Sequence, residues 1–197
     1  MTRTTEAWLR QQLIDTGALL EGHFLLSSGF HSAGYVQCAL LLENPRRARQ
    51  IGERLAEQLS DLGPDSVLAP ALGGLLIGHE VAAALDVPFR FTERVGEGMA
   101  LRRGFALERG ERVVLLEDVV TTGRSSLEAM TVARDHGARI VGAGSILDRT
   151  GGSNPFDVPF RALLALRLET YPVESCPLCA AGDPVVKPGS RPARSGE

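Results

Sequence analysis

A regular alternation of strand-like and helical segments is the feature that most constrains this fold. Strands are expected at residues 66–70, 87–92, 113–116, 140–147 and 161–168. Helices are expected between them, at residues 74–85 and at residues 125–136, where Gly137 ends the second. Strands that alternate with helices form a parallel sheet covered by helices. The sequence therefore predicts an α/β fold with a central, mainly parallel sheet flanked by helices.

Two further segments precede this alternation. Residues 5–16 carry apolar side chains at helical spacing. A second helix is expected to start after Asn44, a good N-cap residue, with Pro45 in its first position. Between these helices, residues 23–38 combine aromatic residues with serine and glycine, which favours short strands or a hairpin.

We expect the 197 residues to form a single domain. About residues 1–40 would make a small N-terminal hood over a core of about residues 41–170. Residues 93–112 are rich in Gly and Arg and predict a mobile loop or a hairpin. The tail of about residues 185–197 is expected to fray.

Composition excludes several classes of protein. A net charge of -3 argues against a nucleic-acid binder that works by bulk charge. The N-terminus lacks the apolar stretch of a signal peptide, and no apolar run of about 18 residues predicts a membrane span. Three cysteines in a chain of this size do not indicate a disulfide scaffold. We therefore expect a cytoplasmic protein that binds neither membranes nor nucleic acid.

Residues 113–126 are the most informative segment. An apolar strand runs directly into Glu117 and Asp118, and a loop at residues 121–123 then opens a helix. Ligands of open parallel sheets bind at the carboxyl ends of the strands. Two carboxylates there can accept hydrogen bonds from the vicinal hydroxyls of a ribose. The free amides at the start of the helix attract a phosphate.

A capped helix beside a surface acidic pair is the structural alternative for this segment. Two carboxylates, two threonines, a glycine and a serine within nine residues favour a ligand site over that alternative. The segment is not a Walker loop, because it lacks the sequence G-x-x-x-x-G-K-[ST].

The segment VVLLEDVVTTGRSS (residues 113–126) resembles the signature by which type I phosphoribosyltransferases bind 5-phosphoribosyl-1-pyrophosphate (PRPP). LAPALGGLLIG (residues 68–78) resembles the pyrophosphate loop of that family, and the resemblance covers about residues 5–185. It implies the type I phosphoribosyltransferase fold and a PRPP site made of Glu117, Asp118, Val119, Val120, Thr121, Thr122, Gly123, Arg124, Ser125, Ala71, Leu72, Gly73 and Gly74.

Three further segments resemble orotate phosphoribosyltransferases in particular. GHFLLSSGFHSAGYVQC (residues 22–38) is similar to their base-side segment, and FTERVGEGMALRRGF (residues 91–105) to the flexible loop of some bacterial members. SILDRTGG (residues 145–152) places Arg149 where these enzymes have an arginine that faces the base. An arginine fork matches the orotate carboxylate. By similarity, Thr121 would also reach orotate; a surface ion pair with Asp148 is the alternative for Arg149.

The resemblance implies transfer of ribose 5-phosphate from PRPP to orotate, which yields orotidine 5'-monophosphate and pyrophosphate in UMP biosynthesis. It implies Mg²⁺ as cofactor, held by substrate oxygens and waters, with no protein residue assigned as its ligand. It also implies a homodimer with shared active sites, in which a loop closes over the pyrophosphate. The expected catalytic residues are Asp118, Glu117, Arg94, Arg102 and Arg103.

The chain departs from this family in two places. Ser27 stands near the position of a lysine found in many orotate enzymes, and the flexible loop uses arginines where many members have lysine and histidine. His31 is one candidate to replace the lysine, and an ordinary hydrogen-bonded loop histidine is the alternative.

Other interpretations stay open at the level of sequence. A purine phosphoribosyltransferase would share residues 113–126 but would not need Arg149, and a regulator could keep the fold to sense PRPP or a nucleotide. Cys176 and Cys179 have the spacing of half a zinc site, but no histidine cluster is expected near them. A second pair from another subunit could complete such a site, while a local disulfide or two free thiols are the simpler expectations.

Overall fold

The computed structural model describes residues 3–26 and 28–187. Ser27 and the tail beyond residue 187 lie outside the described residues. In the part of the chain that is described, no helix combines the length and apolar character needed to cross a membrane.

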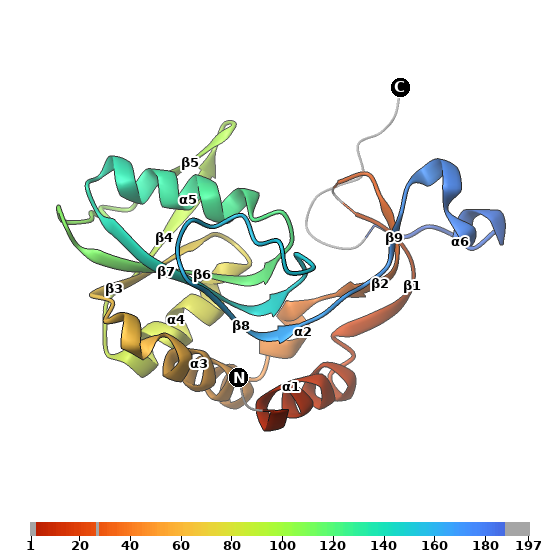
Figure 1. Cartoon of the computed structure of the whole chain (residues 1–197), viewed down its shortest axis with the longest axis horizontal. Helices are drawn as coiled ribbons and strands as arrows, with labels where there is room; N and C mark the ends of the chain where they lie inside the picture. Colours follow the sequence, from red (N-terminus) through yellow and green to blue (C-terminus); the bar gives the residue numbers. More distant parts are fainter. Residues whose placement is uncertain (1–2, 27, 188–197) are drawn as a thin grey trace.

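A six-stranded sheet with the order β5-β4-β3-β6-β7-β8 forms the centre of the molecule (Figure 1). Its strands are β3 (Ser66–Pro70), β4 (Phe89–Val95), β5 (Gly98–Leu101), β6 (Arg112–Val120), β7 (Arg139–Asp148) and β8 (Phe160–Ala165). Neighbouring strands are parallel except β5, which is antiparallel to β4. The predicted α/β class and mainly parallel sheet are therefore confirmed.

Helices cover both faces of this sheet (Figure 1). They are α1 (Arg3–Asp15), α2 (Cys38–Leu42), α3 (Pro45–Leu59), α4 (Gly74–Leu85) and α5 (Arg124–Asp135). Leu116 of β6 belongs to the hydrophobic cluster that contains residues of α1, α3 and α4, while Leu115 belongs to the cluster that contains residues of α5. Successive strand residues point to opposite faces, so residues 113–116 of β6 are all apolar because this part of the strand is buried on both sides.

Local signals placed several helix boundaries correctly. The Asn44 side chain accepts hydrogen bonds from the amides of Arg46 and Arg47 at 3.0 and 3.3 Å, and Pro45 begins α3. The short helix α2 was not expected, and α1 begins two residues before the predicted start at residue 5. The segment 93–112, predicted as a loop or a hairpin, contains the end of β4 and all of β5, so the hairpin alternative is correct.

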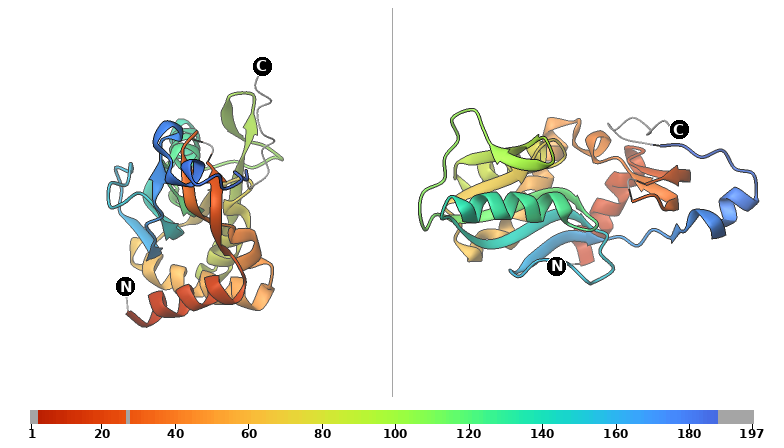
Figure 2. Two further views of the ribbon diagram at one scale, coloured as in Figure 1. Left: turned by 90° about the vertical axis from the view of Figure 1, so that its right-hand side faces the viewer. Right: turned by 90° about the horizontal axis from the view of Figure 1, so that it is seen from above.

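A second, smaller sheet stands beside the core at the right of Figure 1 and faces the viewer in the left view of Figure 2. This hood sheet has the order β1-β2-β9, with β1 at Leu19–Leu25, β2 at His31–Val36 and β9 at Thr170–Tyr171. Its third strand comes from the C-terminal part of the chain, which sequence periodicity did not reveal. The last core strand ends at Ala165 and not at residue 168, because the chain then leaves the core for the hood sheet.

Residues 172–187, the C-terminal segment, continue along the hood sheet. They contain the 3₁₀ helix η2 (Val173–Ser175) and the short helix α6 (Pro177–Ala180). The amide of Val186 donates to the carbonyl of His23, and the amide of Leu25 donates to the carbonyl of Val186, both at 2.8 Å. The tail was expected to fray from about residue 185, but it is still paired with β1 at Val186.

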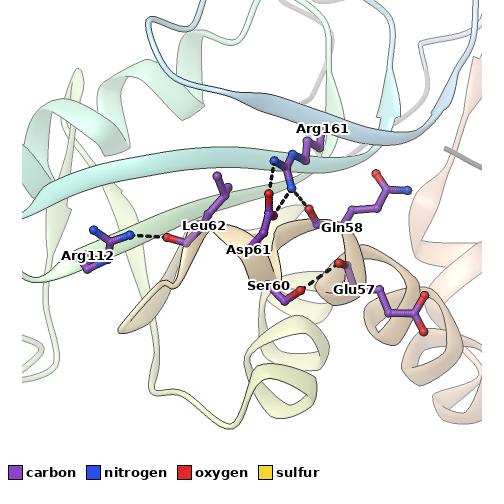
Figure 3. Close-up of polar contacts among 7 residues, drawn as sticks. All are labelled: Glu57, Gln58, Ser60, Asp61, Leu62, Arg112 and Arg161. Atoms are coloured by element: carbon purple, nitrogen blue, oxygen red, sulfur yellow. Dashed lines mark hydrogen bonds and ion pairs between the residues drawn. The ribbon is translucent and has the colours of Figure 1, made fainter.

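Polar contacts tie α3 to the amino-terminal edge of the sheet (Figure 3). Arg161 at the start of β8 donates to Asp61 of the 3₁₀ helix η1 (Ser60–Leu62) and to the carbonyl of Gln58. Arg112 at the start of β6 donates from Nη2 to the carbonyl of Leu62 at 2.5 Å. These contacts lie at the edge opposite the carboxyl ends of the strands, so the carboxyl edge is left for a ligand.

Candidate active site

The carboxyl ends of three adjacent strands bring the predicted ligand loops together. Strand β6 lies between β3 and β7, and all three run in the same direction. Residues 71–73 follow β3, residues 121–123 follow β6, and Arg149 follows β7. The amide of Arg149 donates to the carbonyl of Val120 at 2.8 Å, which holds the third loop against the second. Ligands of open α/β sheets bind at such an edge.

The loop after β3 lies directly against the acidic pair. A Cβ atom built on Gly73 would stand 2.7 Å from Oδ1 of Asp118. The next residue, Gly74, starts α4 so close to β6 that its Cβ would meet the carbonyl of Leu116 at 2.9 Å. Small residues are therefore required here by packing, and they keep backbone amides accessible at Leu72 and Gly73, both of which are exposed.

The two acids are the last acidic residues of β6 and point to opposite sides of it. Glu117 is directed toward α5, where Ser126 Oγ donates to Glu117 Oε2 at 3.1 Å. Asp118 is directed toward Gly73, and its Oδ1 accepts from the amide of Val119 at 2.8 Å. Both side chains are half-buried, so neither is enclosed in the core. The pair straddles the end of the strand, where hydroxyl groups of a ligand can reach it.

Burial controls the protonation of this pair. Loss of solvation raises the pKa of Glu117 well above its ordinary value, and the nearby Asp118 carboxylate raises it further. Burial also raises the pKa of Asp118, although the amide of Val119 acts in the opposite direction. A carboxylate pair without a cation partner is poised to receive hydroxyl donors or a metal-bound ligand.

The start of α5 is open to a ligand. The helix begins at Arg124, and no side chain caps its first amides. The side chains of Thr121, Thr122 and Arg124 are exposed. Gly123 has a left-handed backbone (φ 68°), and a Cβ atom built on it would stand 2.6 Å from Pro155 Cγ. Unsatisfied amides and the helix dipole favour an anion at this point.

Arg149 reaches the same edge and keeps an unsatisfied donor. Its Nε is buried and lacks a hydrogen-bond partner within the described residues. The predicted alternative, an ion pair with Asp148, is not formed: Asp148 Oδ1 instead accepts from the amide of Thr150 at 2.7 Å. Burial lowers the pKa of the Arg149 guanidinium, and the neighbouring Tyr35 opposes that shift. A buried, unpaired guanidinium nitrogen calls for an acceptor such as a carboxylate.

Tyr35 and Cys38 lie close enough to the acidic pair to be influenced by its charge, and neither was predicted as a site residue from the sequence. Burial raises the pKa of the Tyr35 hydroxyl, with further contributions from Asp118 and Cys38, while the charge of Arg149 lowers it. Burial also raises the pKa of Cys38 well above its ordinary value, and the charges of Asp118 and Glu117 add to that shift. Tyr35 belongs to β2, so the hood sheet contributes to the site. The sequence offered one signal, the similarity of residues 22–38 to a base-side segment.

The three arginines of the β4–β5 hairpin lie away from the acidic pair. Arg103 forms a bidentate ion pair with Glu93, in which Nη2 donates to Oε1 at 2.8 Å and Nε donates to Oε2 at 3.0 Å. Arg94 Nη1 lies 2.6 Å from Oε2 of Glu128 on α5, and Arg102 is exposed. Across the described residues no contact joins these arginines to Glu117 or Asp118. Within one chain Arg94 and Arg103 are thus held by carboxylates of that chain.

The expectation that no histidine cluster lies near Cys176 and Cys179 is wrong, and for His31 the structure favours the alternative of a hydrogen-bonded histidine. His31 does not face the candidate site, because its Nδ1 lies 2.7 Å from Nε2 of His23 inside the hood sheet. Cys176 and Cys179 do have histidines nearby, namely the same His23 and His31. Both cysteines are free thiols, which agrees with one of the two simpler expectations.

Comparison with known proteins agrees with this geometry. The family described as "Phosphoribosyl transferase domain" matches residues 39–159. The orotate phosphoribosyltransferase of Thermotoga maritima is 48% identical over 183 residues, which covers 93% of this chain and 98% of that protein. That of Caldicellulosiruptor saccharolyticus is 47% identical over 186 residues, with coverage of 94% and 97%.

A solved structure gives the same answer. The crystal structure of orotate phosphoribosyltransferase from Aeropyrum pernix is 26% identical and superposes with a TM-score of 0.66, covering 80% of this chain and 93% of that one. Nearly the whole sequence is thus closely related to named enzymes. The same sequence contains the acidic pair at the end of β6, the glycine loop beside it and Arg149 with its buried Nε. The chain belongs to the orotate phosphoribosyltransferase family.

Proposed function

We propose that this protein transfers ribose 5-phosphate from PRPP to N1 of orotate, with release of pyrophosphate, at the carboxyl edge of β3, β6 and β7. The observation that carries the proposal is the contact of the Gly73 loop with Asp118, because it unites a diphosphate loop and a ribose site at one point. Family membership supports the same reaction.

PRPP would bind across the three loops. Glu117 and Asp118 would accept hydrogen bonds from the ribose hydroxyls, which are donors that match carboxylates. The amides and hydroxyls of residues 121–125 would hold the 5-phosphate at the uncapped start of α5. The backbone amides of residues 71–74 would hold the diphosphate, and the small side chains there allow the close approach.

Mg²⁺ fits the donor set as a cofactor held mainly by the substrate. The half-buried Glu117 and Asp118 carboxylates supply hard oxygen atoms at the ribose site. Among the described residues, the acidic pair is not part of a group of three or more side chains able to cage an ion. With only these two carboxylates offered by the protein, Mg²⁺ would be held mainly by the bound substrate, and it would supply positive charge near the leaving group.

Orotate would lie between Arg149 and the ribose. The buried, unpaired Nε of Arg149 supports recognition of a carboxylate, which orotate carries and the purine bases lack. Thr121, exposed in the loop after β6, would donate a further hydrogen bond. This arrangement favours orotate over the purine alternative.

The chemistry needs positioning more than acid–base catalysis. N1 of orotate would displace pyrophosphate at the anomeric carbon with inversion, through an oxocarbenium-like transition state. Orotate ionises readily, so no strong general base is required. The protein would contribute by alignment of the two substrates and by stabilisation of charge on the departing pyrophosphate.

The hairpin arginines would act from the partner subunit of a homodimer. Arg94 and Arg103 are paired with carboxylates of their own chain, so they would exchange those partners for pyrophosphate oxygens when the loop closes. We place the enzyme in the cytoplasm as a single domain that needs no nucleic acid or membrane partner.

A direct assay tests this function. Protein, Mg²⁺, PRPP and orotate are mixed, and the loss of orotate absorbance is followed together with formation of orotidine 5'-monophosphate. Adenine, guanine and xanthine replace orotate in parallel reactions. Turnover of a purine without turnover of orotate would overturn the proposed substrate, and PRPP binding without any turnover would favour the regulator.

A further inference from the structure

A second group of chemically reactive side chains lies where the C-terminal segment meets the hood sheet. His23, His31, Cys176 and Cys179 each direct one ligand atom to a common point, and these four atoms lie within 4.8 Å of one another. His31 pairs with Leu25 across β1 and β2, and His23 is two residues from Leu25. The register of this pairing shifts between Glu21 and Phe24, so strand alternation alone does not place His23. The distance of 2.7 Å between His23 Nε2 and His31 Nδ1 shows that both histidines lie on one side of the hairpin.

Three sulfur–nitrogen distances in this group are close to those around a small tetrahedral ion. Cys176 Sγ lies 3.5 Å from His23 Nε2, and Cys179 Sγ lies 3.7 Å from His23 Nε2 and 3.2 Å from His31 Nδ1. In a tetrahedral zinc site, with Zn–N of about 2.0–2.1 Å and Zn–S of about 2.3 Å, adjacent N and S ligands are about 3.5 Å apart. The two ring nitrogens, at 2.7 Å, would separate by about 0.6 Å to reach tetrahedral spacing.

A backbone contact orients one histidine for metal binding. His23 Nδ1 lies 2.8 Å from the carbonyl oxygen of Asp183. A carbonyl accepts but does not donate, so Nδ1 of His23 carries the hydrogen and a neutral ring keeps the lone pair on Nε2. That lone pair is the one directed at His31, Cys176 and Cys179. A backbone carbonyl that fixes the second ring nitrogen in this way is typical of metal-binding histidines.

Apolar packing contributes little to holding the C-terminal segment in place. Of residues 172–186, Cys176 alone is buried, and Val173, Val185 and Val186 are about half exposed. Neither hydrophobic cluster includes His23, His31 or Cys176. A small unit that lacks an apolar core of its own is commonly stabilised by disulfides or a structural metal, and both cysteines here are free.

We propose that His23, His31, Cys176 and Cys179 of one chain bind a structural Zn²⁺ that fastens the C-terminal segment to the β1–β2 hairpin. Two thiolates and two imidazoles close to tetrahedral spacing are a donor set typical of structural zinc sites. All four positions are filled by protein, so the ion has no open position for a substrate and its role is structural. The site needs no second subunit, and it does not depend on the proposed transferase function.

Metal analysis of the full-length protein tests this inference. Protein expressed with added zinc and purified under reducing conditions should contain one zinc per chain. Replacement of zinc by Co²⁺ should give the intense visible bands of tetrahedral cobalt and a near-ultraviolet thiolate charge-transfer band. The variant with both Cys176→Ser and Cys179→Ser should lose the zinc and both spectral features. Matched variants outside the cluster, Cys38→Ala and the exposed His79→Gln, should keep one zinc per chain.

A measurement on the unmodified protein covers the case in which the double variant does not fold. Titration with an organomercurial that blocks thiols should release zinc, detected with a metallochromic dye, as Cys176 and Cys179 react. The inference would be overturned if protein expressed with added zinc proved to be folded and yet contained no zinc. A Cys176–Cys179 disulfide in protein purified with zinc and no reductant, or zinc retained after both thiols are blocked, would also overturn it.

Discussion

Gly73 and Asp118 are in direct contact, although they are 45 residues apart in the sequence: a Cβ atom on Gly73 would stand 2.7 Å from Oδ1 and 3.0 Å from Cγ of Asp118. Gly73 has ordinary helical dihedral angles (φ -56°, ψ -43°), so alanine would fit its backbone without strain. The absence of a side chain at this position therefore serves the approach of the loop to the carboxylate.

Gly73→Ala should damage activity far more than stability. The new methyl group would displace either the Asp118 carboxylate or the diphosphate loop, and a misplacement of about 1 Å can cost about 100-fold in rate. We expect kcat/KM for PRPP to fall by about that factor with little change in Tm.

Gly142→Ala is the matched control at the other half of the sheet, where a Cβ would meet Leu62 Cδ1 at 2.5 Å. It should lower stability by about 1–3 kcal/mol and leave kcat/KM unchanged. The reverse pattern in the two variants would contradict the proposed site.

Glu117→Gln and Asp118→Asn should each lower kcat/KM and stabilise the free protein at neutral pH. Burial raises both pKa values in the folded chain, so the folded state holds these protons to a higher pH than the unfolded state does. The free energy of unfolding therefore falls as pH rises from the unfolded pKa through the raised folded pKa. Neutral amides avoid this loss, and Tm should rise by about 2–4 °C for each kcal/mol regained.

The gain in Tm should disappear below about pH 3, where the wild-type carboxyls are protonated in both states. Thermal melts of the three proteins between acidic and neutral pH give the comparison. A variant that is destabilised equally at every pH would show that the acids serve the fold, and unchanged kinetics of Asp118→Asn would remove Asp118 from the ribose site.

Arg149→Lys should impair orotate binding selectively. Lysine keeps the positive charge but loses the planar fork that matches a carboxylate. Loss of about 1.5–3 kcal/mol, the usual contribution of a charged hydrogen bond, corresponds to a rise of about tenfold to 100-fold in KM for orotate. Steady-state kinetics with each substrate varied in turn should show little change in KM for PRPP.

Arg161→Lys, at the opposite edge of the sheet, is the control. An equal rise in both KM values would count against a base-side role for Arg149.

Subunit mixing tests whether the hairpin acts across a dimer. One variant replaces Arg94, Arg102 and Arg103 by Gln, and the other is Asp118→Asn; each alone should be nearly inactive. In a symmetric dimer with shared sites, random mixing should restore about one quarter of wild-type activity, because half of the dimers are mixed and each has one intact site of two. A hairpin that serves the site of its own chain would restore no activity, and a monomer in solution would contradict the proposal directly.

Local patterns predicted most of the core because they depend on neighbouring residues. The alternation of apolar strands and helices gave the α/β class, and Asn44 and Pro45 gave the start of α3. The position of Glu117 and Asp118 after an apolar strand gave the central part of the candidate site. The edge of a parallel sheet then determines which loops meet, so Gly73, Thr121 and Arg149 were expected in one region.

Contacts between distant segments were decided by tertiary structure. Tyr35 lies close enough to Arg149 to influence its pKa, although it belongs to β2 of the hood sheet, and no periodicity in residues 23–38 encodes that proximity. His23 and Cys176 are 153 residues apart and meet because β9 returns to pair with β2. The sequence alone determined which segments become strands and helices, since backbone preference and burial periodicity are local. How the hood sheet docks, and which side chains it brings together, followed from packing of the whole chain, which no short stretch of residues specifies.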